Sequence, residues 1–266
     1  MNYKKCFAGF TMAEVLITIG IIGVVAAMTF PALVMHHRNK ALESQFKKYY
    51  SIFSQGANPA GYEFSNCNGV YEEDIKKYIY DKLNKLSEKT LAENDKTPMF
   101  PAEYKQYTLT GIEADDNLHQ NCLIGNHNYV YVWGPNYQAV LNDGSFVGIC
   151  SHVGVKDMTY ESGKSYSNGV FITIDVNGLK GPNRFGYDIW SFHLQADTCI
   201  VEAGGTHRNL SEDEPGYGVG SSSQFTKLCD FTDRSSTANG FYCAYYAIQD
   251  KCPDGSGKSY FNCLPN

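Results

Sequence analysis

The chain has 266 residues, with 22 lysines and arginines against 28 aspartates and glutamates, a formal net charge of −6. This acidic balance lacks the basic footprint of nucleic-acid-binding domains, so nucleic acid is not an expected partner. The length suits one anchored domain with insertions.

The most apolar stretch lies near the N-terminus, at residues 9–34, and Glu14 is its one charged side chain. A bilayer core takes roughly 20 apolar residues as helix, so this stretch is long enough to cross a membrane. A charge inside such a span costs about 2.5–3.5 kcal/mol on insertion scales. Glu14 therefore calls for a partner or a purpose.

Lys4 and Lys5, followed by Gly9, Phe10 and then Glu14 at the fifth place after the glycine, resemble a known signal. It is the class III signal of type IV pilins and type II secretion pseudopilins. The resemblance implies that a prepilin peptidase, acting on the cytoplasmic side, cuts between Gly9 and Phe10 and methylates the new N-terminus. The helix would then stay with the protein and serve assembly.

The same resemblance implies assembly roles for Phe10, Glu14 and Pro31. The Glu14 carboxylate would pair with the Phe10 ammonium of a neighbouring subunit, and in a low dielectric such a pair acts as a register key. Pro31 can kink the helix without ending it, since neighbouring helices can satisfy the freed backbone groups.

Two other interpretations of this segment remain open. An ordinary secretory signal could be cut after the small residues Val25-Ala26-Ala27, or the helix could be a plain uncleaved anchor. The apolar run continues to Met35, and Glu14 stands where a signal peptide is purely apolar, so both are less favoured.

After the apolar run, the helix is expected to become amphipathic, because its apolar residues recur every three or four positions. They are Leu42, Phe46, Tyr49, Ile52 and Phe53. This face should pack on the sheet of a globular domain, and Gly56, Asn58 and Pro59 predict the end of the helix. A second amphipathic helix is predicted at residues 72–89.

The period then changes from helical to that of strands, after an irregular segment at residues 97–128. Strands are predicted at 129–133, 137–141, 145–150, 170–176 and 189–194, and a further one at 198–202. Asn142-Asp143-Gly144 is a hairpin turn between two of them. Residues 203–223 are predicted to form a surface loop, and residues 240–248 a short helix.

Residues 175–188, DVNGLKGPNRFGYD, resemble a DxNGxxGPNxxGxD loop of pilin-like proteins. Oxygen donors at Asp175, Asn177 and Asp188 could gather around Ca²⁺, and the resemblance to calcium-binding major pseudopilins suggests this cofactor. The alternative, which we favour, is that these residues are turn formers that satisfy backbone groups without metal.

Nine cysteines are present, and Cys6 lies in the segment expected to be removed. The even number that remains predicts up to four disulfides in an oxidising compartment, without indicating their pairing. They are Cys67, Cys122, Cys150, Cys199, Cys229, Cys243, Cys252 and Cys263. A zinc site using His119, Cys122 and His127, or Cys150 and His152, is less favoured because no matched second half exists.

The expected fold is α+β: a long N-terminal helix packed on an antiparallel sheet of about four strands, with disulfide-stapled loops. Its expected parts are a leader (1–9), a transmembrane half-helix (10–35), an amphipathic half-helix (36–56) and an extracytoplasmic head (57–266). The resemblance implies a single-pass protein of the inner membrane, assembled later into a pilus or pseudopilus with itself and other pilins.

The function expected is therefore that of a structural subunit, with no enzymatic activity, because no catalytic constellation is visible in the sequence. The alternative is a low-abundance minor pilin or adhesin. Its head, in a chain with 20 tyrosines, would bind a surface, a secreted substrate or DNA.

Overall fold

The computed structural model describes residues 9–63, 77, 79–91, 104–114, 136–151, 169–195, 201–203, 229–236 and 239–264. The chain divides into two compact units, Met1–Ala41 and Leu42–Asn266. Each unit is described by itself below.

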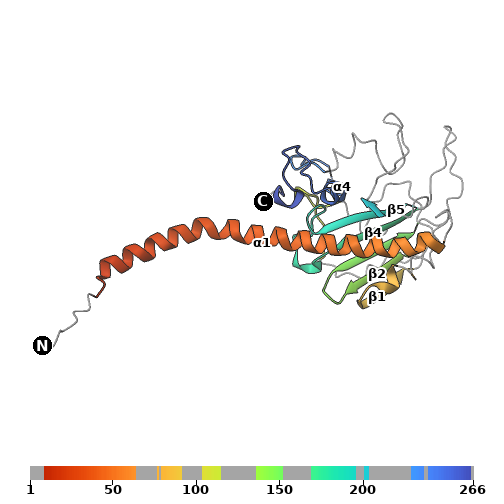
Figure 1. The fold of residues 1–266 in the computed structure, drawn as a ribbon, viewed down its shortest axis with the longest axis horizontal. Helices are drawn as coiled ribbons and strands as arrows, with labels where there is room; N and C mark the ends of the chain where they lie inside the picture. The colour runs from red at the N-terminus through yellow and green to blue at the C-terminus, as the bar shows by residue number, and fades with distance from the viewer. Residues whose placement is uncertain are drawn as a thin grey trace. The chain divides into compact units, whose positions relative to one another are not determined.

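The first unit is the start of helix α1, which runs from Met12 to Glu63 (Figure 1). Among the described residues, α1 is the one helix long and apolar enough to cross a membrane. Its polar side chains are satisfied within the helix: the hydroxyl of Thr18 donates to the Val15 carbonyl, and that of Thr29 to the Val25 carbonyl. Such internal bonds are what a helix needs where no water is present.

The second unit is built on an antiparallel sheet of six strands in the order β1-β2-β3-β4-β5-β6, so that each strand pairs with its neighbour in sequence. The strands are β1 (Lys85–Leu91), β2 (Asn136–Leu141), β3 (Phe146–Ser151), β4 (Gly169–Asp175), β5 (Ile189–Gln195) and β6 (Val201–Ala203). A helix followed by an antiparallel sheet confirms the predicted α+β class.

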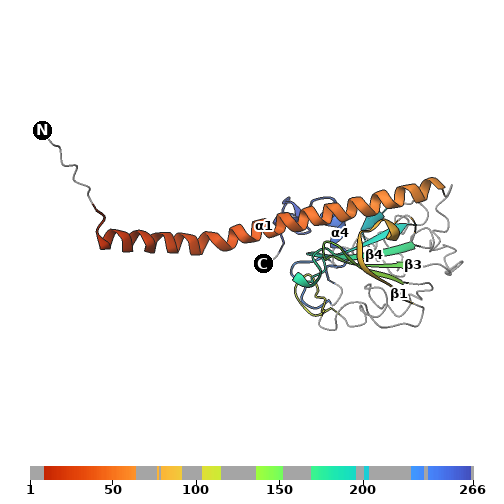
Figure 2. The same cartoon turned by 90° about the horizontal axis from the view of Figure 1, so that it is seen from below.

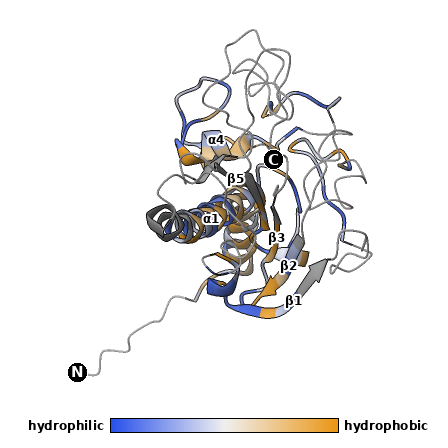
Figure 3. Cartoon of the chain, turned by 90° about the vertical axis from the view of Figure 1, so that its right-hand side faces the viewer, coloured by the Kyte–Doolittle hydropathy of each residue, from blue (hydrophilic) through white to orange (hydrophobic). Residues whose placement is uncertain are grey.

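The second half of α1 packs along one face of this sheet (Figure 2). The ring centroids of Phe46 and Trp190 lie 4.4 Å apart, and those of Phe53 and Phe192 lie 5.7 Å apart. Apolar residues alternate with polar ones along the strands, which gives the sheet this apolar face (Figure 3). Burial of a phenylalanine contributes about 1.5–3 kcal/mol, so this contact is a main source of stability.

A polar contact also joins α1 to the turn between β2 and β3. Asp143 accepts hydrogen bonds from the Lys48 ammonium and the Tyr49 hydroxyl, each at 2.6 Å. Burial opposes ionisation of Asp143, but these donors and Ser145 outweigh it, so the pKa of this carboxyl lies well below its ordinary value. The predicted hairpin turn is therefore also an anchor for the helix.

The structure corrects three predictions about the elements. Residues 72–89 were expected to be helical, but a short 3-10 turn at Tyr80–Lys82 is followed by strand β1. Pairing with β2 explains the strand, because the cross-strand hydrogen bonds outweigh the helical preference of these residues.

The other two corrections concern the end of α1 and the size of the sheet. The helix continues through Gly56 and Pro59 to Glu63, and the described contacts do not explain the added turns. The sheet has six strands instead of about four. The strand predicted at 129–133 lies outside the described residues, whereas the strands predicted near 137, 145, 170 and 189 are confirmed as β2–β5.

Candidate functional site

The predicted processing point lies immediately before α1. Gly9, Phe10 and Thr11 have no helical or strand structure, and the helix begins at Met12. Phe10 is 88% exposed. The Gly9–Phe10 bond is therefore outside the helix and accessible, as a peptide bond must be for a protease to reach it.

Glu14 takes part in a capping box at the start of α1. Its carboxylate Oε2 accepts hydrogen bonds from the backbone N–H and the hydroxyl of Thr11, both at 2.8 Å. In return, the Glu14 N–H donates to the Thr11 Oγ1 at 3.3 Å. These bonds satisfy donors that a helix start leaves free, and they orient the carboxylate.

Thr11 is the residue that our reasoning from sequence missed at this site. Threonine followed three positions later by glutamate is the spacing of a capping box, so the signal was present. The predicted partner of Glu14 belongs to another subunit, whereas Thr11 is a partner within the same chain.

The apolar side chains that follow Glu14 are exposed in the described structure. They include Leu16, Ile19, Ile22, Val25, Phe30 and Leu33. The helix passes through Pro31 without ending. Because Pro31 has no N–H, the carbonyl four residues earlier loses its donor in the helix. A continuous exposed apolar surface of this kind requires lipid or other helices to cover it.

The second predicted site, the loop of residues 175–188, joins β4 to β5. Asp175 Oδ1 accepts the N–H groups of Asn177 and Gly178, at 3.1 and 2.8 Å. Asp188 accepts the N–H groups of Arg184 and Asn183, at 2.6 and 2.9 Å. Each carboxylate therefore holds a turn of its own loop.

Gly178 shows why this loop needs its glycine. Its φ is +60°, and a Cβ there would lie 2.2 Å from the Gly144 carbonyl oxygen in the β2–β3 turn. No side chain fits between the two turns at this distance, so the loop and the hairpin can pack closely only with glycine.

Tyr104, which no sequence pattern indicated, completes the environment of Asp175. Its hydroxyl donates to Asp175 Oδ2 at 2.6 Å, and both residues are buried. Burial, and then the nearby Asp188 carboxylate, raise the pKa of Asp175 well above its usual range. Burial also raises the pKa of Asp188, although the backbone N–H groups that donate to it act to lower this pKa.

The calcium site considered above stays a prediction. Ca²⁺ takes six to eight oxygen ligands, whereas the Asp175 and Asp188 oxygens accept protein N–H and O–H groups. Asn177 uses its amide N–H₂ on the Gly181 carbonyl, and its own buried oxygen has no hydrogen-bond donor. Among the described residues, no three histidine, cysteine, aspartate or glutamate side chains come together.

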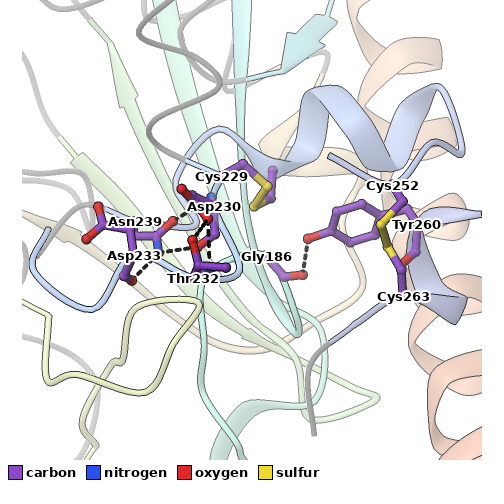
Figure 4. Close-up of a disulfide and its surroundings, with 10 residues drawn as sticks. Gly186, Cys229, Asp230, Thr232, Asp233, Asn239, Cys252, Tyr260 and Cys263 are labelled. Carbon is purple, nitrogen blue, oxygen red and sulfur yellow. Dashed lines mark hydrogen bonds between the residues drawn. A yellow bond between two sulfur atoms is a disulfide. The ribbon is translucent and has the colours of Figure 1, made fainter. Parts of the chain in front are cut away.

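Two disulfides staple the C-terminal segment: Cys229–Cys243 and Cys252–Cys263. Cys243 opens the short helix α4 (Cys243–Ile248), and Tyr260, between the second pair, donates its hydroxyl to the Gly186 carbonyl at 2.6 Å (Figure 4). The staples thus hold this segment against the loop before β5.

The other four cysteines of the predicted disulfides lie wholly or partly outside the described structure. Cys67, Cys122 and Cys199 lie outside the described residues, as do His119, His127 and His152. Cys150 lies in β3, and only its backbone is described. The prediction of two further disulfides among these four cysteines stays a prediction.

Comparison with protein families matches residues 4–30 to the prokaryotic N-terminal methylation motif. This is the prepilin-type motif of type IV pilins and pseudopilins, so the chain carries the signal that its sequence resembles. Searches of curated proteins and of solved structures each found no match.

Proposed function

We propose that this protein is a structural subunit of a type IV pilus or of a type II secretion pseudopilus, cut between Gly9 and Phe10 by a prepilin peptidase. The observation that carries the proposal is the methylation motif, which covers residues 4–30 and the start of α1. Both machines use this signal, so the proposal covers both. The role is structural and not enzymatic.

The capping box is compatible with a second role for Glu14. Cleavage would create an ammonium on Phe10, four residues before Glu14. An ionised carboxylate offers about four acceptor positions on its two oxygens, and Thr11 fills two of them on Oε2. The remaining capacity serves the ammonium of a neighbouring subunit, while Thr11 holds the carboxylate in place.

Mass spectrometry of the protein from its native membrane or filament fraction tests this proposal. We expect a mature chain that begins at N-methylated Phe10. Four disulfides would make it lighter by about eight hydrogens, since each bond removes two. A chain that begins at Met28 would indicate an ordinary signal peptide, and one that begins at Met1 a plain anchor. Either result would remove the filament proposal.

The alternative of an adhesin with a tyrosine-rich binding surface loses part of its support. Seven tyrosines of the described residues are buried in the head: Tyr49, Tyr80, Tyr104, Tyr137, Tyr187, Tyr242 and Tyr260. Most of the tyrosines that the structure describes therefore belong to the core. The size of the head still favours a minor subunit, and abundance in sheared filaments distinguishes the two, because a major subunit dominates them.

A further inference from the structure

Four basic side chains follow the apolar run of α1 directly. His36, His37, Arg38 and Lys40, here called the basic collar, are all exposed. Successive residues of an α-helix are about 100° apart, so the four side chains leave the helix in at least three directions. The collar therefore spreads over more than one face of the helix, although it does not close into a ring, because Asn39 between Arg38 and Lys40 is buried.

Positive charge is concentrated in this part of the chain. Residues 1–41 contain four lysines and arginines and one acidic residue, Glu14. Residues 42–266 contain 18 basic and 27 acidic residues. No acidic residue lies between Glu14 and Glu43 in the sequence.

The length of the helix places the collar at a definite depth in a bilayer. At about 1.5 Å per residue, His36 lies about 36 Å and Lys40 about 42 Å along the helix from Met12. A bilayer is about 40–45 Å thick with its headgroups. If the start of α1 lies at one surface, the collar lies in the headgroup layer of the other.

We propose that the basic collar binds anionic phospholipid headgroups and holds the subunit at the membrane surface before assembly. The inference rests on the proposed function, since it requires that α1 span a membrane. Guanidinium and ammonium groups form charge-assisted hydrogen bonds with phosphate oxygens. Two such charges near an anionic surface correspond to a preference of at most about 30-fold, or about 1 kcal/mol each.

The arrangement favours lipid over a second copy of the chain as the partner. A docked protein surface contacts one side of a helix, whereas lipids surround it on every side that is open to the bilayer. Arg38 and Lys40 place their charges on two different sides of the helix, and the collar directly continues an apolar surface that lipid would cover. Both features fit an annulus of headgroups.

The test uses the full chain in nanodiscs of equal parts phosphatidylglycerol and phosphatidylcholine. Native mass spectrometry measures the ratio of the two lipids that remain on the protein. The collar variant is Arg38→Gln with Lys40→Gln. The matched control, Lys180→Gln with Lys258→Gln, removes two exposed charges from the head. Protection from protease shows whether each chain spans the bilayer.

We expect several-fold enrichment of phosphatidylglycerol on the unchanged chain and on the control, and a ratio near one on the collar variant. The enrichment should also weaken in high salt, which screens exposed charges. Unchanged enrichment on the collar variant, or an equal loss on the control, would overturn the proposal.

Two further outcomes distinguish lipid binding from binding of a second copy and from failure of the proposed function. If the collar variant keeps its lipid preference but loses self-association in discs of phosphatidylcholine alone, the collar binds a second copy and the lipid proposal is wrong. If neither the unchanged chain nor any variant spans the bilayer, the proposed function is wrong, and this inference, which depends on it, is wrong too.

Discussion

At the scale of single residues, the two buried aspartates of the β4–β5 loop are the least ordinary groups of the head. Asp175 and Asp188 are 2% and 0% exposed, and their negative charges oppose each other. Their backbone donors favour the charged form, whereas burial favours the neutral one, and burial prevails. The loop is therefore a place where folding and proton binding are coupled.

The stability of the head should depend on pH through Asp175. Its pKa is raised in the folded state, so the stabilisation is complete below the ordinary value of about 4 and is lost as pH rises through the folded value. Asp143 has a lowered pKa, so its contribution to stability is complete above about pH 4 and is lost as the pH falls below that value. We therefore expect the free energy of unfolding to fall from pH 5 towards pH 8.

Asp175→Asn should flatten this pH dependence. The amide oxygen can still accept both backbone N–H groups, and its N–H₂ can donate to the Tyr104 hydroxyl oxygen. Denaturant unfolding at several pH values, followed by tryptophan fluorescence, measures the slope. The control is Asp254→Asn, an exposed aspartate in a turn. A slope equal to that of the unchanged protein would show that Asp175 does not titrate in this range.

At the scale of elements, α1 changes its role along its length. Its first part exposes apolar side chains, and its second part buries Leu42, Phe46, Tyr49 and Phe53 against the sheet. Phe46 lies at the centre of this contact, since its ring contacts those of Trp190, Phe192 and Phe261. The helix thus carries both the exposed apolar segment and part of the core of the head.

Phe46→Ala should lower the free energy of unfolding by about 3–5 kcal/mol, because it leaves a cavity in a tightly packed aromatic cluster. The control is Leu86→Ala in the edge strand β1, whose side chain is 71% exposed. This change should stay within about 0.5 kcal/mol. Equal effects of the two substitutions in denaturant unfolding would contradict the described packing of α1 on the sheet.

At the scale of the whole molecule, the two units require different surroundings. The head has a core and disulfides of its own, whereas the first part of α1 presents a surface that needs lipid or neighbouring helices. Glu14 lies in that surface, where an uncompensated charge is costly. The pairing of Glu14 with an ammonium is therefore the step on which the proposed assembly depends.

Substitutions of Glu14 separate its charge from its capping role. Glu14→Gln can keep the capping box with Thr11, since glutamine also serves at this position, but it removes the charge. Glu14→Ala removes both. We expect both variants to be cut after Gly9 and both to give few filaments, as measured by the protein recovered after shearing. Normal assembly of Glu14→Gln would assign the role to the cap and remove the charge pair.

The sequence alone determined the features that depend on local pattern. The motif around Gly9 and Glu14, the apolar span, the alternation of β2–β5 and the Asp-Gly turn are all written in short stretches of residues. Hydrophobic period and turn chemistry decide such features locally, and for this reason they could be predicted without the fold.

Only the tertiary structure decided the features that depend on distant partners. Residues 85–91 form a strand because they pair with β2, although their local pattern favours a helix. The raised pKa of Asp175 depends on its burial and on the nearby Asp188, and its hydrogen bond comes from Tyr104. The pairing of Cys229 with Cys243 follows from the packing of the C-terminal segment. Burial and pairing join residues far apart in the chain, and no local pattern contains that information.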